Sequence, residues 1–262
     1  LPYLITRLSG HSFQWLPFYN LKQWNQFKRR MPMIEQLKNQ IDQSESFAEF
    51  KSVFQRTETL TESFLGIHRW SITFADIFSI LLEKFLKRID NDTLSLKAID
   101  LLSGLAHNKT VEINLALKNC KTDSEFEQFL SRYGYRSESL DIAQPSWAES
   151  GERIKRLLKT VHRNEHTARI GQLDESRKQK EAECIHYIQT LPWSIRYPVR
   201  CIFKALLYYG QEFTRLRENQ RDAWHQILFV MRNTVLKTAD NLVIQTRLEN
   251  RHDIFYLPRK EF

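Results

Sequence analysis

The chain has few of the residues that turn-rich folds and cysteine chemistry require. Its 262 residues include only 7 glycines, 7 prolines and 3 cysteines. A β-sandwich or barrel needs many turns, which glycine and proline favour, so their scarcity argues against an all-β fold. Cys120, Cys184 and Cys201 are far apart and have the spacing of neither a disulfide framework nor a zinc site. They are typical of free thiols in a reducing compartment, and we expect a cytoplasmic protein.

Several catalytic and membrane signatures are also missing. The sequence has no Gly-rich phosphate loop, no Cys-x-x-Cys, no His-Glu-x-x-His and no Gly-x-Ser-x-Gly. His162 and His166 have metal-ligand spacing, but no third ligand is evident beside them, so we predict no metal site. No run approaches 18 uncharged apolar residues and no signal peptide is recognisable, so we predict no transmembrane span. Because the chain starts at Leu1 rather than Met, we expect a piece of a longer polypeptide.

The charge balance is basic, with 39 Lys and Arg against 31 Asp and Glu and a net charge of +8. Such a balance is compatible with a nucleic acid or an anionic membrane as partner. However, basic and acidic residues alternate along most of the chain, and no run of five basic residues occurs. We therefore interpret most charges as solvated helix faces and expect neither nucleic acid nor membrane as the main partner.

Apolar residues recur at intervals of three and four along most of the chain, which predicts helix after helix. Residues 58–89 are the most apolar block and predict a core helix, with Ile77 and Leu81 among its core positions. Residues 196–240 carry an apolar seam interrupted by Gln220 and predict a helix of roughly 65 Å. We predict an all-α fold, one multi-helical domain over residues 1–262, with this very long helix near the C-terminus and a short β-like run at residues 253–257.

Two segments allow more than one interpretation. Residues 12–40 mix aromatic and basic side chains, which is compatible with an interfacial membrane helix or with aromatic residues packed on neighbouring helices, interrupted near Pro17 and Pro32. Residues 159–183 are strongly charged and have few large apolar groups. They predict an exposed helical hairpin or an insertion, with a turn near Gly171.

Residues 129–147 concentrate charge around a helix end. Thr122 and Glu125 form a capping box that starts a helix, and Gly134 is expected to stop it. Ser146 and Glu149 repeat the capping box after the loop. Desolvating the charges of this loop is costly unless they pair with one another or meet a ligand. Its charged and aromatic residues are Arg132, Tyr135, Arg136, Glu138, Asp141 and Trp147.

A second group of basic residues lies on the predicted long helix. Arg217, Arg221 and His225 recur at four-residue intervals, with Arg215 beside them. Such a row could hold an anionic or hydroxylated ligand. It is equally compatible with ion pairs to Glu212, Glu218 and Asp222 in water.

Four blocks of the sequence resemble the middle of phosphoenolpyruvate-utilising phosphotransferases, a group that includes rifampicin phosphotransferase and relatives of phosphoenolpyruvate synthase. The blocks are residues 101–117, 129–147, 213–221 and 253–257. The second is similar to the family pattern Phe-Leu-x-x-Tyr-Gly-His-Arg, followed by Glu-Leu-Asp and a Trp. Tyr135 stands where the family usually has His, and Ala-Glu-Ser-Gly follows Trp147 where the family tends to have Arg-Glu-Asp-Pro.

The resemblance implies a division of labour among domains. An ATP-grasp domain transfers phosphate from ATP, with Mg, to a histidine on a swivelling domain, which delivers it to a small-molecule acceptor on the helical middle domain. This chain resembles the middle domain alone. The resemblance therefore implies no catalytic residue and no cofactor within the chain, and it implies the ATP-grasp and phosphohistidine domains of the same polypeptide as partners. An inactive homologue that acts as a scaffold, or a helical module that binds anionic partners, is the alternative.

The resemblance also suggests where an acceptor would bind. Phosphoryl transfer depends on positioning and on positive charge near the phosphate oxygens, so we expect the loop to pack on the long helix and form the rim of the site. Because the pKa of a tyrosine is about 10, Tyr135 would act as a hydrogen-bond donor and not as a base at neutral pH. The same residues are equally suited to lock the loop to the helix. The predicted substrate-binding residues are Arg132, Tyr135, Arg136, Trp147, Arg217 and Arg221, with Trp70 as a further wall; the predicted orienting residues are Glu138, Asp141 and Glu218.

Overall fold

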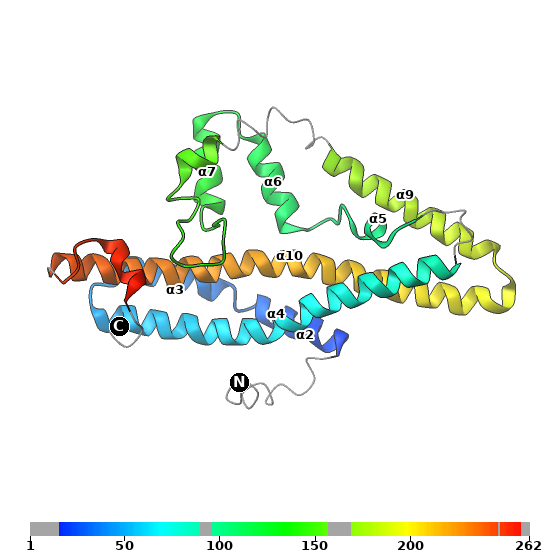
Figure 1. Ribbon diagram of the computed structural model, residues 1–262, viewed down its shortest axis with the longest axis horizontal. Helices are drawn as coiled ribbons and strands as arrows, with labels where there is room; N and C mark the ends of the chain where they lie inside the picture. The colour runs from blue at the N-terminus through cyan, green and yellow to red at the C-terminus, as the bar shows by residue number, and fades with distance from the viewer. Residues whose placement is uncertain (1–15, 90–95, 157–168, 246, 258–262) are drawn as a thin grey trace. The chain divides into compact units, whose positions relative to one another are not determined.

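The structure is a computed structural model that describes residues 16–89, 96–156, 169–245 and 247–257, with the backbone alone at 169–172. These residues form helices and loops without a strand, so the all-α prediction is confirmed for them. His162 and His166 lie outside the described residues, as do residues 258–262, whose sequence predicts the start of a helix. The elements are α2 (Pro17–Lys28), α3 (Pro32–Gln43), α4 (Phe47–Ile89), α5 (Ala98–Leu102), α6 (Lys109–Asn119), α7 (Asp123–Tyr133), α9 (Arg169–Thr190), α10 (Trp193–Ile244) and the 3-10 helix η2 (Arg251–Tyr256) (Figure 1).

Two helices are much longer than the rest: α4 has 43 residues and α10 has 52. The very long helix near the C-terminus is therefore confirmed. The core helix predicted over residues 58–89 begins earlier, at Phe47. Gly210 lies inside α10, where a Cβ atom would stand 3.1 Å from Leu102 Cδ2. The missing side chain lets Leu102 of α5 approach the helix closely.

Contacts divide the chain into two compact units, each assembled from three segments. The first unit comprises residues 1–21, 67–119 and 157–220, and the second comprises 22–66, 120–156 and 221–262. Each long helix contributes one part to each unit, because α4 passes from the second unit to the first after Gly66 and α10 passes back after Gln220. The expectation of one acceptor-binding domain over residues 1–262 stays a prediction.

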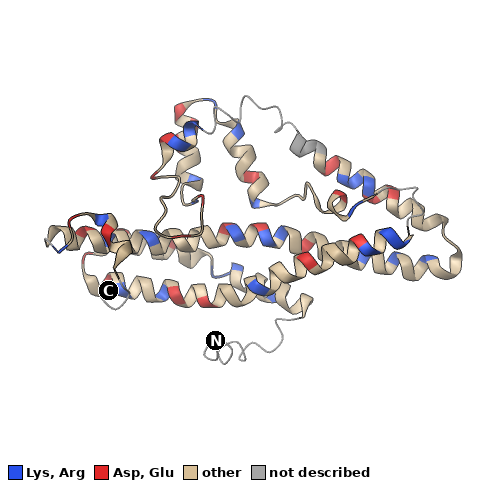
Figure 2. Ribbon diagram, in the orientation of Figure 1, with Lys and Arg blue, Asp and Glu red and all other residues tan. Residues whose placement is uncertain are grey.

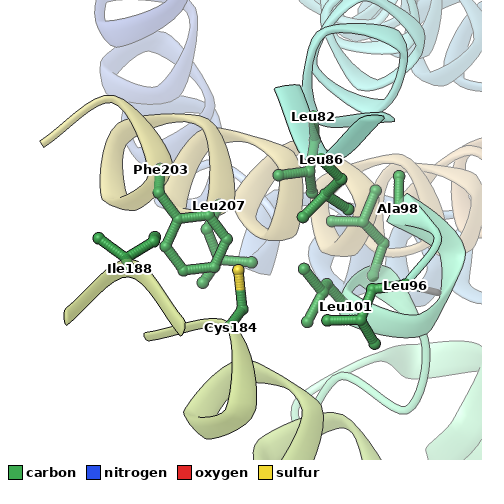
Figure 3. Packing of buried hydrophobic residues seen from close by; sticks show 10 residues of the cluster. Leu82, Leu86, Leu96, Ala98, Leu101, Cys184, Ile188, Phe203 and Leu207 are labelled. Carbon is green, nitrogen blue, oxygen red and sulfur yellow. The ribbon is translucent and has the colours of Figure 1, made fainter. Parts of the chain in front are cut away.

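The core of the first unit is built where the end of α4 meets α5, α9 and α10 (Figure 3). Ile77 and Leu81 are exposed, which corrects their prediction as core residues. Leu82 and Leu86 are buried instead. The face of α4 that contacts α5, α9 and α10 therefore includes Leu82 and Leu86 and not Ile77 and Leu81. The buried residues are Leu82, Leu86, Leu96, Ala98, Leu101, Leu102, Cys184, Ile188, Phe203 and Leu207.

A chain of hydrogen bonds explains the polar interruption in the apolar seam of α10. Gln220 Nε2 donates to Ser71 Oγ at 2.9 Å, and Gln220 Oε1 lies 2.9 Å from His68 Nδ1. The Ser71 hydroxyl lies 2.8 Å from Asn20 Oδ1. A buried polar network whose members hydrogen-bond to one another favours one helix register over others. These hydrogen bonds therefore fix α10 against α4 and against the start of α2 within the first unit.

The second unit packs aromatic rings from three helices. Trp24 stacks on Phe27 at 5.7 Å between centroids, Phe27 contacts Phe64, and Phe64 stacks on Trp224 at 5.2 Å. The packing interpretation of residues 12–40 is thus confirmed for Trp24 and Phe27, while Phe18 is exposed.

By length and composition alone, α4 is apolar enough to cross a membrane. One 18-residue window has a mean hydropathy of 1.2, and 33% of it is buried within the protein. The core helices of soluble proteins meet the same criterion, so a single helix of this kind is weak evidence for a membrane span.

Two local predictions are wrong. Residues 253–257, predicted as β-like, belong largely to η2. Its first turn is closed by reciprocal bonds: Asn250 Oδ1 accepts from the His252 N–H at 2.9 Å, and the Asp253 carboxylate accepts from the Asn250 N–H at 3.0 Å. Gly171, predicted at a turn, lies inside α9. A glycine costs a helix interior only about 1 kcal/mol, which the rest of a 22-residue helix can outweigh.

Replacing Gly104 with alanine tests the turn between α5 and α6. We expect Gly104→Ala to lower the free energy of unfolding by about 1–3 kcal/mol, because φ at this position is +63° and a Cβ would lie 2.7 Å from the backbone carbon of Leu173. Urea unfolding would measure the change. Gly151→Ala is the control, since its Cβ would meet only the flexible end of Leu130. Equal destabilisation by both substitutions would contradict this account of Gly104.

Candidate functional site

The loop after α7 starts and ends at positions that local sequence sets. Thr122 Oγ1 accepts from the Glu125 N–H at 3.2 Å, and Glu125 Oε2 accepts from the Thr122 N–H at 2.9 Å, so the predicted capping box is confirmed. Gly134 ends α7 as predicted, although with φ of −63° it needs no left-handed conformation. The glycine is required for space, because its Cβ would stand 2.9 Å from Ala148 Cβ where the loop returns. The Ala148 N–H donates to the Gly134 carbonyl at 3.0 Å and closes the loop.

The two sides of the loop are joined by a short antiparallel bridge. Ser137 pairs with Ser146, and the Trp147 N–H donates to the Arg136 carbonyl at 2.6 Å. The Trp147 ring stacks on Phe129 at 6.1 Å, and the Arg136 guanidinium lies 5.5 Å from the Trp147 ring centre. Arg136 therefore contacts Trp147 twice, through its backbone carbonyl and through its guanidinium.

Asp222 of α10 accepts hydrogen bonds at this end of the loop. It accepts from the Tyr135 hydroxyl at 2.8 Å and from Gln226 Nε2 at 2.9 Å, and it lies 3.9 Å from Arg136 Nη1. Both Asp222 and Arg136 are buried. Burial and the charge of Asp222 raise the pKa of Tyr135 well above its usual value. Tyr135 thus stays a neutral hydrogen-bond donor, which excludes a role as general base.

Arg232 fixes the other end of the loop. Its Nε and Nη2 donate to the two oxygens of Glu149 at 2.8 and 2.9 Å, and its Nη1 donates to the Ile142 carbonyl at 2.6 Å. Glu149 also accepts from the Ser146 N–H at 2.8 Å, as the capping box predicts. Burial opposes ionisation of Glu149, but the bonds from Arg232 and Ser146 outweigh it and lower its pKa to about 2. The guanidinium also lies 5.1 Å from the ring centre of Phe255.

His225 lies between these two anchors and is buried. Its Nδ1 accepts from the Ser137 N–H at 3.5 Å, which places the proton of the neutral ring on Nε2. Burial, reinforced by the charges of Arg136 and Arg221, lowers the pKa of His225 to about 4. The ring is therefore neutral at physiological pH and serves as an acceptor for the loop backbone.

The structure brings some of the predicted site residues together and disperses others. Tyr135, Arg136 and Trp147 form one cluster. Arg132 is exposed at the end of α7, over the ring of Tyr133 at 5.1 Å. Glu138 forms an exposed ion pair with Arg153 at 2.8 Å. Asp141 accepts from the Ala143 N–H at 2.9 Å and shapes its own loop. An orienting role for Glu138 and Asp141 stays a prediction.

The remaining predicted residues belong to the first unit, apart from Arg221, which is exposed on α10 in the second. Arg217 is exposed and lies 3.4 Å from Glu218 Oε1. Glu218 also accepts from the Thr110 hydroxyl at 2.9 Å, and Arg215 pairs with Glu212. The ion-pair interpretation is thus confirmed for Arg215 and Arg217. Trp70, in the same unit, stacks on Phe74 at 6.0 Å. A substrate-binding role for the predicted residues stays a prediction.

A cavity of about 440 Å³ opens beside the loop within the second unit. It lies between the first turns of α4, the loop at residues 141–143, the C-terminal part of α10, and η2. No group of three metal-ligating side chains occurs among the described residues. The lining residues are Phe47, Phe50, Lys51, Phe54, Gln55, Glu58, Asp141, Ile142, Ala143, Thr234, Val235, Thr238, Ile254, Phe255 and Leu257.

Sequence reasoning missed Arg232 altogether and treated Asp222 only as a solvent partner. Both are buried on α10. A signal was present, since His225, Phe229 and Arg232 are spaced by four and three residues and therefore share a helix face. An arginine that is buried on a helix face needs a carboxylate partner. The sequence offers no means of choosing Glu149 among the acidic residues of the chain.

Residues 118–218 match the rifampicin phosphotransferase fourth domain. The matched stretch covers less than half of the 262 residues but contains α7, the whole loop and the first half of α10. No protein of curated function matches the chain. The predicted resemblance to rifampicin phosphotransferase is therefore confirmed over residues 118–218.

Removing Arg232 tests the anchor of the loop. We expect Arg232→Met to lower the free energy of unfolding by about 2–3 kcal/mol, below the 3–5 kcal/mol of a fully buried pair because Glu149 keeps some contact with water. Chemical unfolding of Arg232→Met, Glu149→Gln and the double variant would give the coupling energy. Arg153→Met is the matched control and should cost less than about 1 kcal/mol, since its pair with Glu138 is exposed. A coupling energy near zero would contradict the anchor.

The neutral state of His225 predicts a pH dependence of stability. A histidine whose folded pKa lies below its unfolded value of 6.5 contributes stability above pH 6.5, and that contribution is lost as the pH falls towards about 4. We expect His225→Gln, whose side-chain oxygen can still accept from Ser137, to abolish this part of the pH dependence. Unfolding midpoints measured from pH 7 to 4 would show it. The loss from Glu149 falls in a lower window, between pH 4.5 and about 2, and should persist in the variant.

Proposed function

We propose that the chain is the acceptor-binding helical domain of an ATP-dependent phosphotransferase that works through a phosphohistidine. The observation that carries the proposal is the position of the cavity: the loop of the matched stretch supplies Asp141, Ile142 and Ala143 to its lining. Its volume of about 440 Å³ lies in the range of pockets that hold small molecules. A family-specific loop beside a small-molecule cavity supports an acceptor site.

The lining indicates the chemistry of the acceptor. Four phenylalanine side chains and several aliphatic ones supply most of it, with a few polar groups such as Lys51, Gln55 and Glu58. The Thr234 and Thr238 hydroxyls donate to the backbone of their own helix, at 2.8 and 2.9 Å. This combination suits a molecule with a large apolar surface that leaves a hydroxyl free for phosphorylation. The name of the matched family gives rifampicin as its acceptor, and we propose an acceptor of that kind for this chain.

The two buried arginines at the loop, Arg136 and Arg232 of α10, do not carry the chemistry in this proposal. Arg136 and Arg232 are buried and each pairs with a carboxylate. Moving Arg136 to a phosphate would leave the buried Asp222 uncompensated, and moving Arg232 would break its hydrogen bonds to Glu149 and to the Ile142 carbonyl. We therefore assign the transfer to an ATP-grasp domain and a swivelling phosphohistidine domain of the same polypeptide, acting in the cytoplasm with ATP and Mg. The chain itself holds the acceptor and needs no cofactor of its own.

Filling the cavity tests the assignment. In the full-length polypeptide, supplied with ATP, Mg and rifampicin, we expect Ala143→Trp to lower kcat/KM for acceptor phosphorylation at least 10-fold, mainly through a higher KM, because the indole occupies the acceptor's space. Gln55→Trp fills the cavity from the exposed face of α4 and guards against a folding defect in the loop. Phosphorylated product would be measured by mass spectrometry.

Ala182→Trp, on an exposed turn of α9 in the first unit, is the matched control and should change kcat/KM less than about 2-fold. If both cavity-filling variants keep wild-type kinetics while folded, the acceptor does not bind in this cavity. If the wild-type polypeptide phosphorylates neither rifampicin nor any other apolar alcohol, the proposed function is wrong.

A further inference from the structure

A row of aromatic and basic side chains follows one exposed face of α10 at its N-terminal end. Its members are Trp193, Tyr197, Arg200, Lys204 and Tyr208, which we call the aromatic–basic stripe. They are separated by four, three, four and four residues, so they share one face of the helix. Trp193 is 86% exposed, Tyr197 76% and Tyr208 55%. The opposite face, with Phe203 and Leu207, is buried in the core of the first unit.

The charge around the stripe is unusual for this chain. Residues 184–211 contain no Asp or Glu, although the whole chain has 31 (Figure 2). Arg200 and Lys204 form no ion pair among the described residues. Elsewhere on the same helix, Arg215 and Arg217 each have a glutamate beside them. Residues 193–211 of α10 therefore carry basic side chains without an acidic residue among them. This part of the helix has a positively charged surface.

The rings of the stripe are placed for contact and not for packing within the chain. Tyr208 is braced edge-on by Tyr209 at 5.2 Å between centroids, and Tyr209 stacks on Phe78 at 5.0 Å in the core. A supported ring loses little conformational entropy on binding, which favours its use as an anchor. Exposed tryptophans are costly to solvate, and a large aromatic patch on a folded protein usually marks a binding surface.

The composition points to a protein partner. Trp, Tyr and Arg are the residues most enriched among those that carry binding energy in protein interfaces, and anchors at this spacing are typical of a helix that lies in a groove. Three rings can bury on the order of 400 Å², about half of what each side of a standard interface contributes. Two cations on a convex helix provide too few phosphate contacts for tight nucleic-acid binding, which tracks a continuous positive groove.

We propose that the aromatic–basic stripe is a docking surface for an acidic face of another domain of the same polypeptide. The inference rests on the proposed function in one respect only, namely that the partner domain belongs to the same polypeptide. Carboxylates of the partner pair with Arg200 and Lys204, and its apolar groove covers Trp193 and Tyr197. The surface belongs to the first unit, whereas the proposed acceptor cavity lies in the second, so the two assignments involve different residues.

Hydroxyl-radical footprinting of the full-length polypeptide tests the docking surface. Tyr256 is 88% exposed and provides an internal standard of the same residue type as Tyr197. We expect Tyr197 to be oxidised at least 5-fold more slowly than Tyr256, because the partner covers it. The double variant Arg200→Glu/Lys204→Glu should restore rapid oxidation of Tyr197 and Trp193. The matched control Lys84→Glu/Arg88→Glu has the same four-residue spacing on exposed positions of α4 and should leave them protected.

The identity of the partner follows from zero-length coupling of amines to carboxylates. We expect Lys204 to couple to an Asp or Glu outside residues 1–262 of the same polypeptide.

Oxidation of Tyr197 as fast as that of Tyr256 in the wild type would overturn the proposal, as would coupling of Lys204 only to residues 1–262 of a second copy. Protection that appears only when DNA or phosphatidylserine vesicles are added would also overturn it. None of these readouts depends on acceptor phosphorylation, so their failure leaves the proposed function standing, and failure of phosphorylation leaves the docking surface standing.

Discussion

The pair of Arg232 and Glu149 is the interaction on which the second unit's loop and cavity depend. One guanidinium binds both oxygens of the carboxylate, the carbonyl of Ile142 and, through its face, the ring of Phe255. Arg232 thereby joins α10 to the helix turn at Glu149, to the cavity wall at Ile142 and to Phe255 of η2. A lysine has no planar fork with which to make these contacts together. The low pKa of Glu149 records how strongly the folded protein favours the ionised carboxylate.

The two kinds of arginine on α10 differ in what burial permits. Arg232 is desolvated and each of its three nitrogens donates a hydrogen bond, so releasing it to a ligand would remove the anchor of the loop. Arg200 is in water and keeps its donors for an external partner at little cost. Charge near a family motif is therefore a poor guide to chemistry unless the degree of burial is known. In this chain the buried arginines maintain the shape of the site, and the exposed ones near Trp193 are suited to binding.

The sequence could predict the features that depend on neighbours along the chain. Thr122 with Glu125, Ser146 with Glu149, and Gly134 lie within a turn of their partners, so local spacing specifies them. It could not predict that Glu149 meets Arg232, since 83 residues separate them and many carboxylates compete. The register of α4 was missed for the same reason: whether Leu81 or Leu82 faces inward depends on the helices that pack against it. Residues 253–257 are rich in residues that favour strands, but Asn250 closes a turn that this composition does not reveal.

Tyr135 shows how a recognisable motif can contribute shape without reactivity. It stands where the resembling family has a histidine, a residue that can change its charge near neutral pH. In this chain the hydroxyl donates to a buried aspartate that also accepts from Gln226, and its raised pKa keeps it neutral. A titrating group at this position would compete with Arg136 for Asp222 and alter the field at His225, whose low pKa depends partly on Arg136. The tyrosine donates to Asp222 without adding a charge. Position 135 therefore links the loop to α10 in this chain through a neutral hydrogen bond.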